Sequence, residues 1–405
     1  MNQSQKFSGN YSFKQELLPQ PEMLEEKKGK RILSVGIPKE LDKYENRIIL
    51  TPQAVRQLTD EGHNILIESG AGVKSRWKDT DYKAAGAIIK SRKDIFKSEI
   101  ILKVSPFEIE DIKLLTGNQM VISALHLNTQ NLEKISQLKF KKITAVAIEM
   151  MDNRVGFNSF VQTMNEIAGI MAVNIAGEYL CNTETGKGIL LGGITGIPAA
   201  KIIILGAGTA GEYAAGTGLG LGAQIKIFDN SLEKLQRLKN KFGIQLFTSI
   251  LQKEVIIKAL KTADVVIAAL DEPNEDNCVL ISEKMITSMK KGSVIIDLNT
   301  DSGSYIATSQ VTHLGNPAYE KHGIIHYCVP NIASKAPRTA SVALSNTIFP
   351  ILQKICLEKN THDMIRNIPE IRNGTYIYEG ILTNDRLAKK FNLDYKDIEL
   401  LTTFF

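Results

Sequence analysis

A glycine-rich segment near the middle of the chain carries the strongest chemical signal in the sequence. Residues 201–205 are Lys-Ile-Ile-Ile-Leu, and Gly206-Ala-Gly-Thr-Ala-Gly211 follows them directly, before a stretch with a helical pattern. Gly206 permits a tight turn, Gly208 lets the backbone approach a pyrophosphate, and Gly211 allows a helix to pack closely on the strand. The start of that helix adds unpaired N–H groups and the positive end of its dipole. The segment predicts a dinucleotide-binding turn, although an α/β turn without a ligand can share this pattern.

An aspartate follows at the position where a nucleotide ribose is usually bound. The apolar residues 224–228 end at Asp229, and an acid roughly 20 residues beyond the glycines, at the end of the second strand, accepts hydrogen bonds from the adenosine ribose. The same carboxylate repels the 2′-phosphate that distinguishes NADP from NAD. The sequence therefore predicts NAD as the cofactor.

Several polar residues follow other apolar runs, at the end where open α/β sheets bind their ligands. Two cations suit a substrate carboxylate, and an imidazole suits proton transfer to an oxygen or nitrogen on the reacting carbon. Each residue alone is also consistent with a solvated loop charge, or in the histidine's case with packing beside a strand. Together they predict a dehydrogenase for a 2-oxo, 2-hydroxy or 2-amino acid. These residues are Arg47, Lys103, His126, Asp297, Asp301 and Asn331.

The elements that must position these residues alternate between apolar runs and helical stretches. Short Val/Ile-rich runs of this kind are typical of strands buried on both faces of a parallel sheet. They form two series, so the sequence predicts an α/β fold with two doubly wound lobes. The first series is 32–37, 64–68, 99–104, 120–125 and 143–148, and the second is 201–205, 224–228, 264–269, 293–298 and 324–329.

The two series also predict the domain organisation. Residues 1–30 read as a polar N-terminal tail, and 31–160 together with 338–359 read as the substrate and catalytic domain. Residues 161–337 read as the NAD-binding domain, with the boundary in a long helical stretch around 160–180. Residues 360–405 read as an ordered C-terminal extension to which no chemistry is assigned.

Composition narrows the class of protein. The chain has 405 residues, of which 43% are hydrophobic and 23% charged, which excludes disorder; its net charge of +5 is too weak to suggest nucleic acid or a membrane as partner. The four cysteines form no CxxC pair, so neither a disulfide framework nor a metal site is expected. The first residues contain no apolar signal segment, and no transmembrane helix is expected. A cytoplasmic protein with a small-molecule substrate fits these observations best.

Particular segments resemble the alanine dehydrogenase family, which shares its superfamily with the NAD-binding subunit of proton-translocating transhydrogenase. The resemblance runs from about Ile32 to Ile355. The combination of ENR, LHL and LLGG followed by GAGTAG is specific to the family. The matching segments include VGIPKELDKYENRIILTPQAV, EIILKVSP, ISALHL, MNEIAGIMA, GKGILLGGITGIP, IIILGAGTAGEYAA, GSVIIDLNTDSG and HYCVPNIASKAPRTASVALSN.

The resemblance implies two Rossmann-like lobes with the active site in the cleft between them, and assembly as a homo-oligomer, usually a hexamer. It implies the oxidation of L-alanine to pyruvate and ammonium, with reduction of NAD. It makes Arg47 and Lys103 the substrate binders, and His126 and Asp301 the catalytic pair. Beside the three glycines, it places Asn165, Thr209, Ala210, Asp229, Lys234, Leu270, Asp271, Leu298, Val329 and Asn331 at the cofactor.

A few positions depart from the family pattern. Asn165 replaces a usual serine, Ala124 a usual aromatic residue and Gln310 a usual arginine, and Thr300–Ser304 alters the turn that holds Asp301. Three alternatives remain open. They are a transhydrogenase-like NAD-binding subunit, a saccharopine- or lysine-type dehydrogenase of the same superfamily, and a degenerate enzyme kept as a binding or structural protein.

Overall fold

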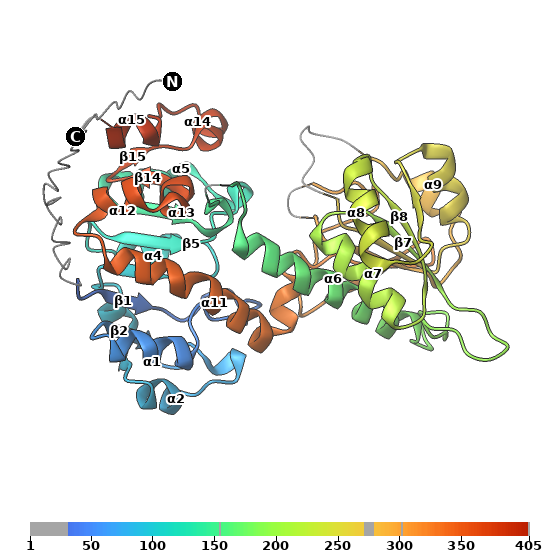
Figure 1. Cartoon of the computed structure of the whole chain (residues 1–405), viewed down its shortest axis with the longest axis horizontal. Coiled ribbons are helices and arrows are strands. Elements are labelled where there is room, and N and C mark those ends of the chain that lie inside the picture. The colour runs from blue at the N-terminus through green and yellow to red at the C-terminus, as the bar shows by residue number, and fades with distance from the viewer. Residues whose placement is uncertain (1–30, 154, 271–278, 301–302, 404–405) are drawn as a thin grey trace, which may run out of the picture.

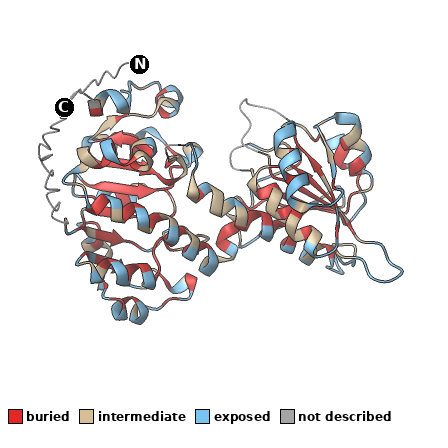
Figure 2. Ribbon diagram, viewed as in Figure 1, coloured by how far each residue is buried: buried red, intermediate tan, exposed pale blue. Residues whose placement is uncertain are grey.

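The computed structural model describes residues 31–153, 155–270, 279–300 and 303–403, and it consists of two lobes joined by long helices (Figure 1). The predicted N-terminal tail, residues 1–30, lies outside the described residues. Each lobe is built around one sheet whose strands are largely buried (Figure 2). The prediction of an α/β protein with two such lobes is confirmed.

The first lobe contains an eight-stranded sheet in the order β15-β14-β6-β5-β4-β1-β2-β3. Six of its strands are parallel, and the last two along the chain are antiparallel to their neighbours. The strands are β1 (Ser34–Ile37), β2 (Asn64–Glu68), β3 (Ile88–Lys90), β4 (Ile100–Leu102), β5 (Met120–Ser123), β6 (Thr144–Ala147), β14 (Thr375–Tyr378) and β15 (Ile381–Leu382).

Helices from both ends of the described chain pack on this sheet. The first of them, α1 (Pro52–Asp60), is capped by the Thr51 hydroxyl, has proline in its first turn and buries Ala54, Val55 and Leu58. The long α11 (Pro337–Cys356) adds its leucine and isoleucine face to the same core. The others are α2 (Asp79–Ala84), α3 (Arg92–Ile95), α4 (Ile109–Leu114), α5 (Leu132–Phe140), α12 (Thr361–Asn367), α13 (Pro369–Gly374), α14 (Asp385–Phe391) and α15 (Ile398–Thr403).

The second lobe contains a seven-stranded sheet in the order β12-β13-β11-β10-β7-β8-β9, parallel except for β12. Its strands are β7 (Lys201–Leu205), β8 (Gln224–Phe228), β9 (Phe247–Ser249), β10 (Val265–Ala268), β11 (Val294–Asp297), β12 (Ala318–Lys321) and β13 (Ile324–Tyr327). Its helices are α7 (Thr209–Gly220), α8 (Leu232–Phe242), α9 (Lys253–Leu260) and α10 (Glu283–Ile286).

The helix α6 (Ser159–Leu180) runs from one lobe to the other, beside the start of α11 (Figure 1). Its far half is rich in alanine and glycine and packs tightly on α7. A Cβ atom at Gly169 would lie only 2.2 Å from the carbonyl oxygen of Ala210. The proposed domain boundary falls within this helix.

All ten predicted apolar runs contain a strand, with ends shifted by at most a few residues. The short strands β3, β9 and β12 were not predicted, and neither were β14 and β15, with which the C-terminal extension enlarges the first sheet. Within the described residues, no single helix meets the length and apolarity that a membrane span requires, and one bent pair, α11 with α12 at 119°, does so by length and composition only. Among the described residues, Cys181, Cys328 and Cys356 are not joined in disulfides.

Candidate active site

Three of the predicted substrate and catalytic residues follow three neighbouring strands. Arg47 lies in the loop after β1, Lys103 directly follows β4, and His126 follows β5 by two intervening residues. These strands are adjacent and parallel in the order β5-β4-β1, so their carboxyl ends meet at one edge of the first sheet. The topology therefore brings this part of the predicted site together.

The Arg47 guanidinium is already bound by an acid of its own loop. Its Nε and Nη2 donate to the two carboxylate oxygens of Glu45 at 2.8 and 2.6 Å, and its Nη1 lies 3.3 Å from the sulfur of Met164. Burial acts to raise the pKa of Glu45, but the charge and hydrogen bonds of Arg47 outweigh it and hold that pKa below its ordinary value. A guanidinium has five N–H donors, so Arg47 retains donors for a second carboxylate.

Lys103 is buried among carboxylates. Its Nζ donates to Asp111 Oδ2 at 2.5 Å and to the carbonyl oxygen of Pro106 at 3.2 Å, and it lies 3.7 Å from Glu40 Oε2. Burial raises the pKa of Glu40, while the charge of Lys103 acts in the opposite direction. Both predicted cations are thus paired with acids of the protein, and this pairing was not predicted from the sequence.

His126 occupies a strained backbone position and has an exposed side chain. Its φ of 44° lies in the left-handed region, which a residue other than glycine seldom adopts. Glu149 holds the turn, because its carboxylate accepts hydrogen bonds from the backbone N–H groups of Leu125 and His126 at 2.9 and 2.8 Å. Strain of this kind is frequent at functional sites, and the exposed imidazole is accessible for proton transfer.

The glycine turn of the second lobe has the form that a dinucleotide site needs. A Cβ atom at Gly206, whose φ is 110°, would lie 2.2 Å from the carbonyl oxygen of Ala269, and one at Gly211 would lie 2.0 Å from that of Gly206. Gly208 caps α7 without a side chain, so the first N–H groups of the helix are not covered by a capping group. The residues present fit a pyrophosphate at this helix start.

Asp229 is buried directly beside that turn. Its Oδ2 accepts the N–H of Ala207 at 2.7 Å, and its Oδ1 accepts the N–H of Ser231 at 2.7 Å. Each carboxylate oxygen keeps lone pairs beyond these bonds, so the residue can fix the turn and also accept ribose hydroxyls. The nearby Arg237, which could favour a 2′-phosphate, donates to the Ala207 carbonyl and pairs with Glu212 at 2.9 Å.

The other predicted cofactor residues are spread over several elements of the second lobe and α6. Leu270, Leu298 and Val329 each follow one of the strands β10, β11 and β13, which continue the sheet from β7. Thr209 begins α7 and donates to Gln162 of α6 at 2.8 Å, and Ala210 is buried against α6. Lys234 lies on α8, and Asn165 is exposed on α6. The predicted residues Asp271 and Asp301 lie outside the described residues.

The last predicted cofactor residue, Asn331, meets the first lobe instead. Its Nδ2 donates to Glu45 Oε2 at 2.8 Å, and Ser334 Oγ lies 3.3 Å from Glu45 Oε1. Tyr44 directly precedes Glu45 in the loop that carries Arg47, and its ring stacks on His313 of the second lobe with the ring centroids 4.4 Å apart. The loop that carries Arg47 is thus also a contact between the lobes.

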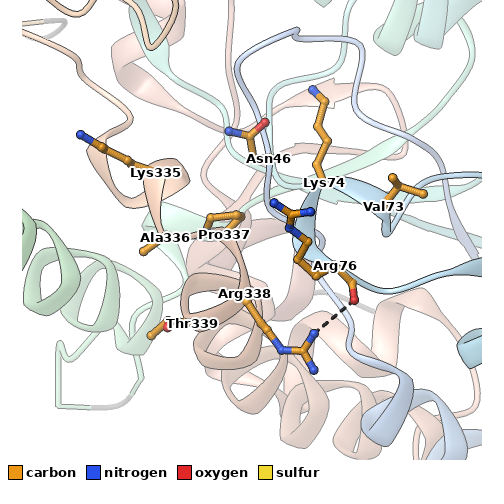
Figure 3. Close-up of a pocket in the computed structure, with 9 residues that line it drawn as sticks. All are labelled: Asn46, Val73, Lys74, Arg76, Lys335, Ala336, Pro337, Arg338 and Thr339. Atoms are coloured by element: carbon orange, nitrogen blue, oxygen red, sulfur yellow. Dashed lines mark hydrogen bonds between the residues drawn. The ribbon is translucent and has the colours of Figure 1, made fainter.

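A cavity of about 550 Å³ adjoins this contact (Figure 3). Four cations line it, but three have partners. Lys74 donates to three backbone carbonyls, Arg338 donates to the carbonyl oxygen of Arg76, and Lys335 pairs with Glu178. The lining residues do not include Arg47, Lys103 or His126, so this cavity lies beside the predicted chemistry. Among the described residues, no group of three or more His, Cys, Asp or Glu side chains is placed to hold a metal ion.

Two domain models of one known protein family match the chain. The N-terminal domain model of alanine dehydrogenase/PNT matches residues 36–168, and the C-terminal domain model of the same family matches residues 172–385. The chain belongs to the alanine dehydrogenase/PNT family. Its relatives include alanine dehydrogenase 2 of Staphylococcus aureus, 34% identical, and alanine dehydrogenase of Staphylococcus epidermidis, 35% identical; each match covers 91% of this chain and 99% of the relative.

Solved structures are similar to this chain as well. An L-alanine dehydrogenase matches with a TM-score of 0.83 and 31% identity, over 88% of this chain and 98% of its own. A transhydrogenase from Sinorhizobium meliloti matches with a TM-score of 0.74 and 23% identity, over 87% and 99%. At that identity, the second match speaks for the fold alone.

Proposed function

We propose that this protein is an L-alanine dehydrogenase, which oxidises L-alanine reversibly to pyruvate and ammonium with NAD. One observation carries the proposal. The chain is 34–35% identical to alanine dehydrogenases over 91% of its length, and it carries two complementary sets of residues. Arg47, Lys103 and His126 follow strands of the first sheet, and a glycine turn fit for a dinucleotide follows a strand of the second sheet. NAD, when bound, supplies the hydride acceptor for the α-carbon of alanine.

The side chains of the first lobe then have separate tasks. Arg47 binds the substrate carboxylate through the donors that Glu45 leaves unused, and Lys103 orients the carboxylate and the α-carbon substituent from its buried position. Loss of hydride from the α-carbon leaves an iminium on the substrate, which water attacks. His126 transfers protons to and from the resulting carbinolamine, which contributes about 10²–10⁴-fold to the rate. By resemblance, Asp301 stabilises the cation and positions the water.

We also propose that the protein works in the cytoplasm as a homo-oligomer, a hexamer by resemblance to its family, with neither nucleic acid nor membrane as partner. An apolar arm, residues 182–199, supports assembly. It extends from the second lobe (Figure 1), and Leu190, Ile194 and Ile197 are each about 60% exposed on it. Exposed apolar groups gathered in this way favour burial against another chain. Light scattering should give a mass well above one chain, and Ile194→Asp together with Ile197→Asp should lower it.

The activity is tested by measuring NADH formation with NAD and a panel of amino acids. We expect L-alanine to give the highest kcat/KM, with pyruvate and ammonium as products. A preference for lysine or saccharopine would indicate the second alternative named above. Hydride exchange between two nucleotides without use of any amino acid would indicate a transhydrogenase-like subunit, and either result would overturn the proposal.

A further inference from the structure

The carboxylate of Glu45 lies at the contact between the two lobes, where it touches groups that belong to both halves of the predicted site. It is only 2% exposed. It accepts from the Nε and Nη2 of Arg47, the predicted substrate binder. It also accepts from the Nδ2 of Asn331, a predicted cofactor residue, at 2.8 Å. Among the described residues, no other acid is hydrogen-bonded to both Arg47 and Asn331.

The surrounding contacts leave this carboxylate little freedom. The backbone N–H of Arg47 donates to Glu45 Oε1 at 2.9 Å, and Ser334 Oγ lies 3.3 Å from the same oxygen. Ser334 also donates to the carbonyl oxygen of Tyr44 at 2.9 Å and accepts the N–H of Asn46 at 2.8 Å. The chain on either side of Glu45 is therefore tied to the same segment of the second lobe.

We infer that Glu45 is a positioning residue that couples substrate binding at Arg47 to cofactor binding in the second lobe through Asn331. This inference rests on the proposed function. A substrate carboxylate that binds Arg47 fixes the guanidinium, and with it the Glu45 oxygens that Asn331 must reach. A nucleotide that orders the turn at Asn331 fixes the same carboxylate from the other side. Each ligand thereby finds part of the other's site already ordered, which gives positive coupling.

Glutamine is the most informative replacement. Glu45→Gln keeps the size of the side chain but replaces one acceptor oxygen by an NH₂ donor, which must then face a donor of Arg47 or of Asn331. The variant cannot satisfy both neighbours at once. Asp264→Asn serves as a matched control, because Asp264 is also buried and ion-paired, with Lys187 at 2.8 Å and Lys290 at 3.1 Å. Asp264 precedes β10, so it lies at the amino ends of the strands of the second sheet, away from the predicted site.

The coupling is measured as the Kd for NADH without pyruvate divided by the Kd with saturating pyruvate, in the absence of ammonium so that amination does not occur. In the wild type we expect pyruvate to tighten NADH binding by roughly 5- to 150-fold. In Glu45→Gln the ratio should fall to about one, while NADH binding alone changes little and the KM for alanine rises. Asp264→Asn should lose stability and keep the wild-type ratio.

Two results would overturn the inference. The first is that the wild type is active and the ratio of NADH dissociation constants is unchanged in Glu45→Gln, even if the KM for alanine rises. Glu45 would then orient Arg47 alone. The second is a wild-type ratio of one. If Glu45→Gln does not fold, Asn331→Ala decides, because it removes the hydrogen bond from Asn331 to Glu45 and leaves the pair of Arg47 and Glu45 intact. An unchanged ratio in that variant also refutes the coupling. A wild type without activity on alanine would instead count against the proposed function.

Discussion

The two lobes prepare the same part of their sheets, the carboxyl ends of parallel strands, in opposite ways. The second lobe offers mainly backbone, in the form of the Gly206 turn and an α7 start without a capping side chain, with the buried carboxylates of Asp229 and Asp297 at the ends of β8 and β11. The first lobe offers charged side chains that are already paired, Arg47 with Glu45 and Lys103 with Asp111. The second lobe therefore suits a large ligand that is bound mostly by backbone N–H groups. The first lobe suits a small anion that binds to cations whose charge is already balanced by acids of the protein.

Removal of the imidazole of the first lobe should have the largest effect. We expect His126→Ala to lower kcat by about 10²–10⁴-fold, because the carbinolamine would lose its proton donor and acceptor. NAD binding and folding should remain, since this ring is exposed and belongs to the other lobe. Measurement of kcat and melting temperature on one preparation tests this. A variant that is less stable but fully active would make His126 a structural residue.

Whereas His126 of the first lobe is exposed, His326 of the second lobe is fully buried, so acid should lower the stability of the second lobe. Burial lowers the pKa of His326 to about 4, and its ring bonds Thr308 and the carbonyl oxygen of Ile324. Because the unfolded chain then binds more protons between pH 6.5 and 4, the free energy of unfolding falls by about 3 kcal/mol as the pH falls through that range. His326→Gln should show a smaller loss in denaturant titrations at pH 7 and pH 4, and an equal loss would place the acid sensitivity elsewhere.

Loss of the substrate cation should affect one ligand and spare the other. Arg47→Ala removes a charge-assisted pair with the substrate carboxylate, so kcat/KM for alanine should fall by an amount equivalent to roughly 1.5–3 kcal/mol. It also leaves Glu45 buried without its cation, so the protein should lose stability. The Kd for NADH alone should change little. If alanine kinetics are unchanged, the substrate site lies elsewhere.

The smallest expected change concerns cofactor choice. Asp229 places a carboxylate directly beside the Gly206 turn of the second lobe, so Asp229→Ser should narrow the preference for NAD over NADP by removing repulsion of the 2′-phosphate. The ratio of kcat/KM for the two cofactors measures this. Equal values in the wild type would contradict the assignment.

How far the sequence predicts each feature depends on how local its cause is. The turn at Gly206 and the ten buried strands follow from neighbouring residues, and the sequence was sufficient for them. The hairpin of β14 and β15 was missed although its two-residue turn, Glu379-Gly380, has positive φ at both positions and is of a type that favours glycine. Short edge strands such as β9 bury little and leave a weak pattern.

The acids of the first lobe were missed for a different reason. Glu149 supports the turn at His126 across 23 residues, and Glu40 reaches Ser105 across 65. Glu45 meets Asn331 across 286 residues. Partners at such distances come together only through the order of strands in the sheet, which spacing along the chain does not reveal. Even Glu45, two residues before Arg47, lies in a loop whose side-chain directions follow from the lobe contact.

The central claim is that hydride passes from the α-carbon of alanine, held by the first lobe, to the nicotinamide held by the second. It is tested most directly with L-alanine that carries deuterium at the α-carbon, by measuring the mass of the NADH that forms. The account predicts that the reduced cofactor carries the deuterium, and that pyruvate and ammonium appear in equal amount. Unlabelled NADH, or no NADH from alanine, would contradict it.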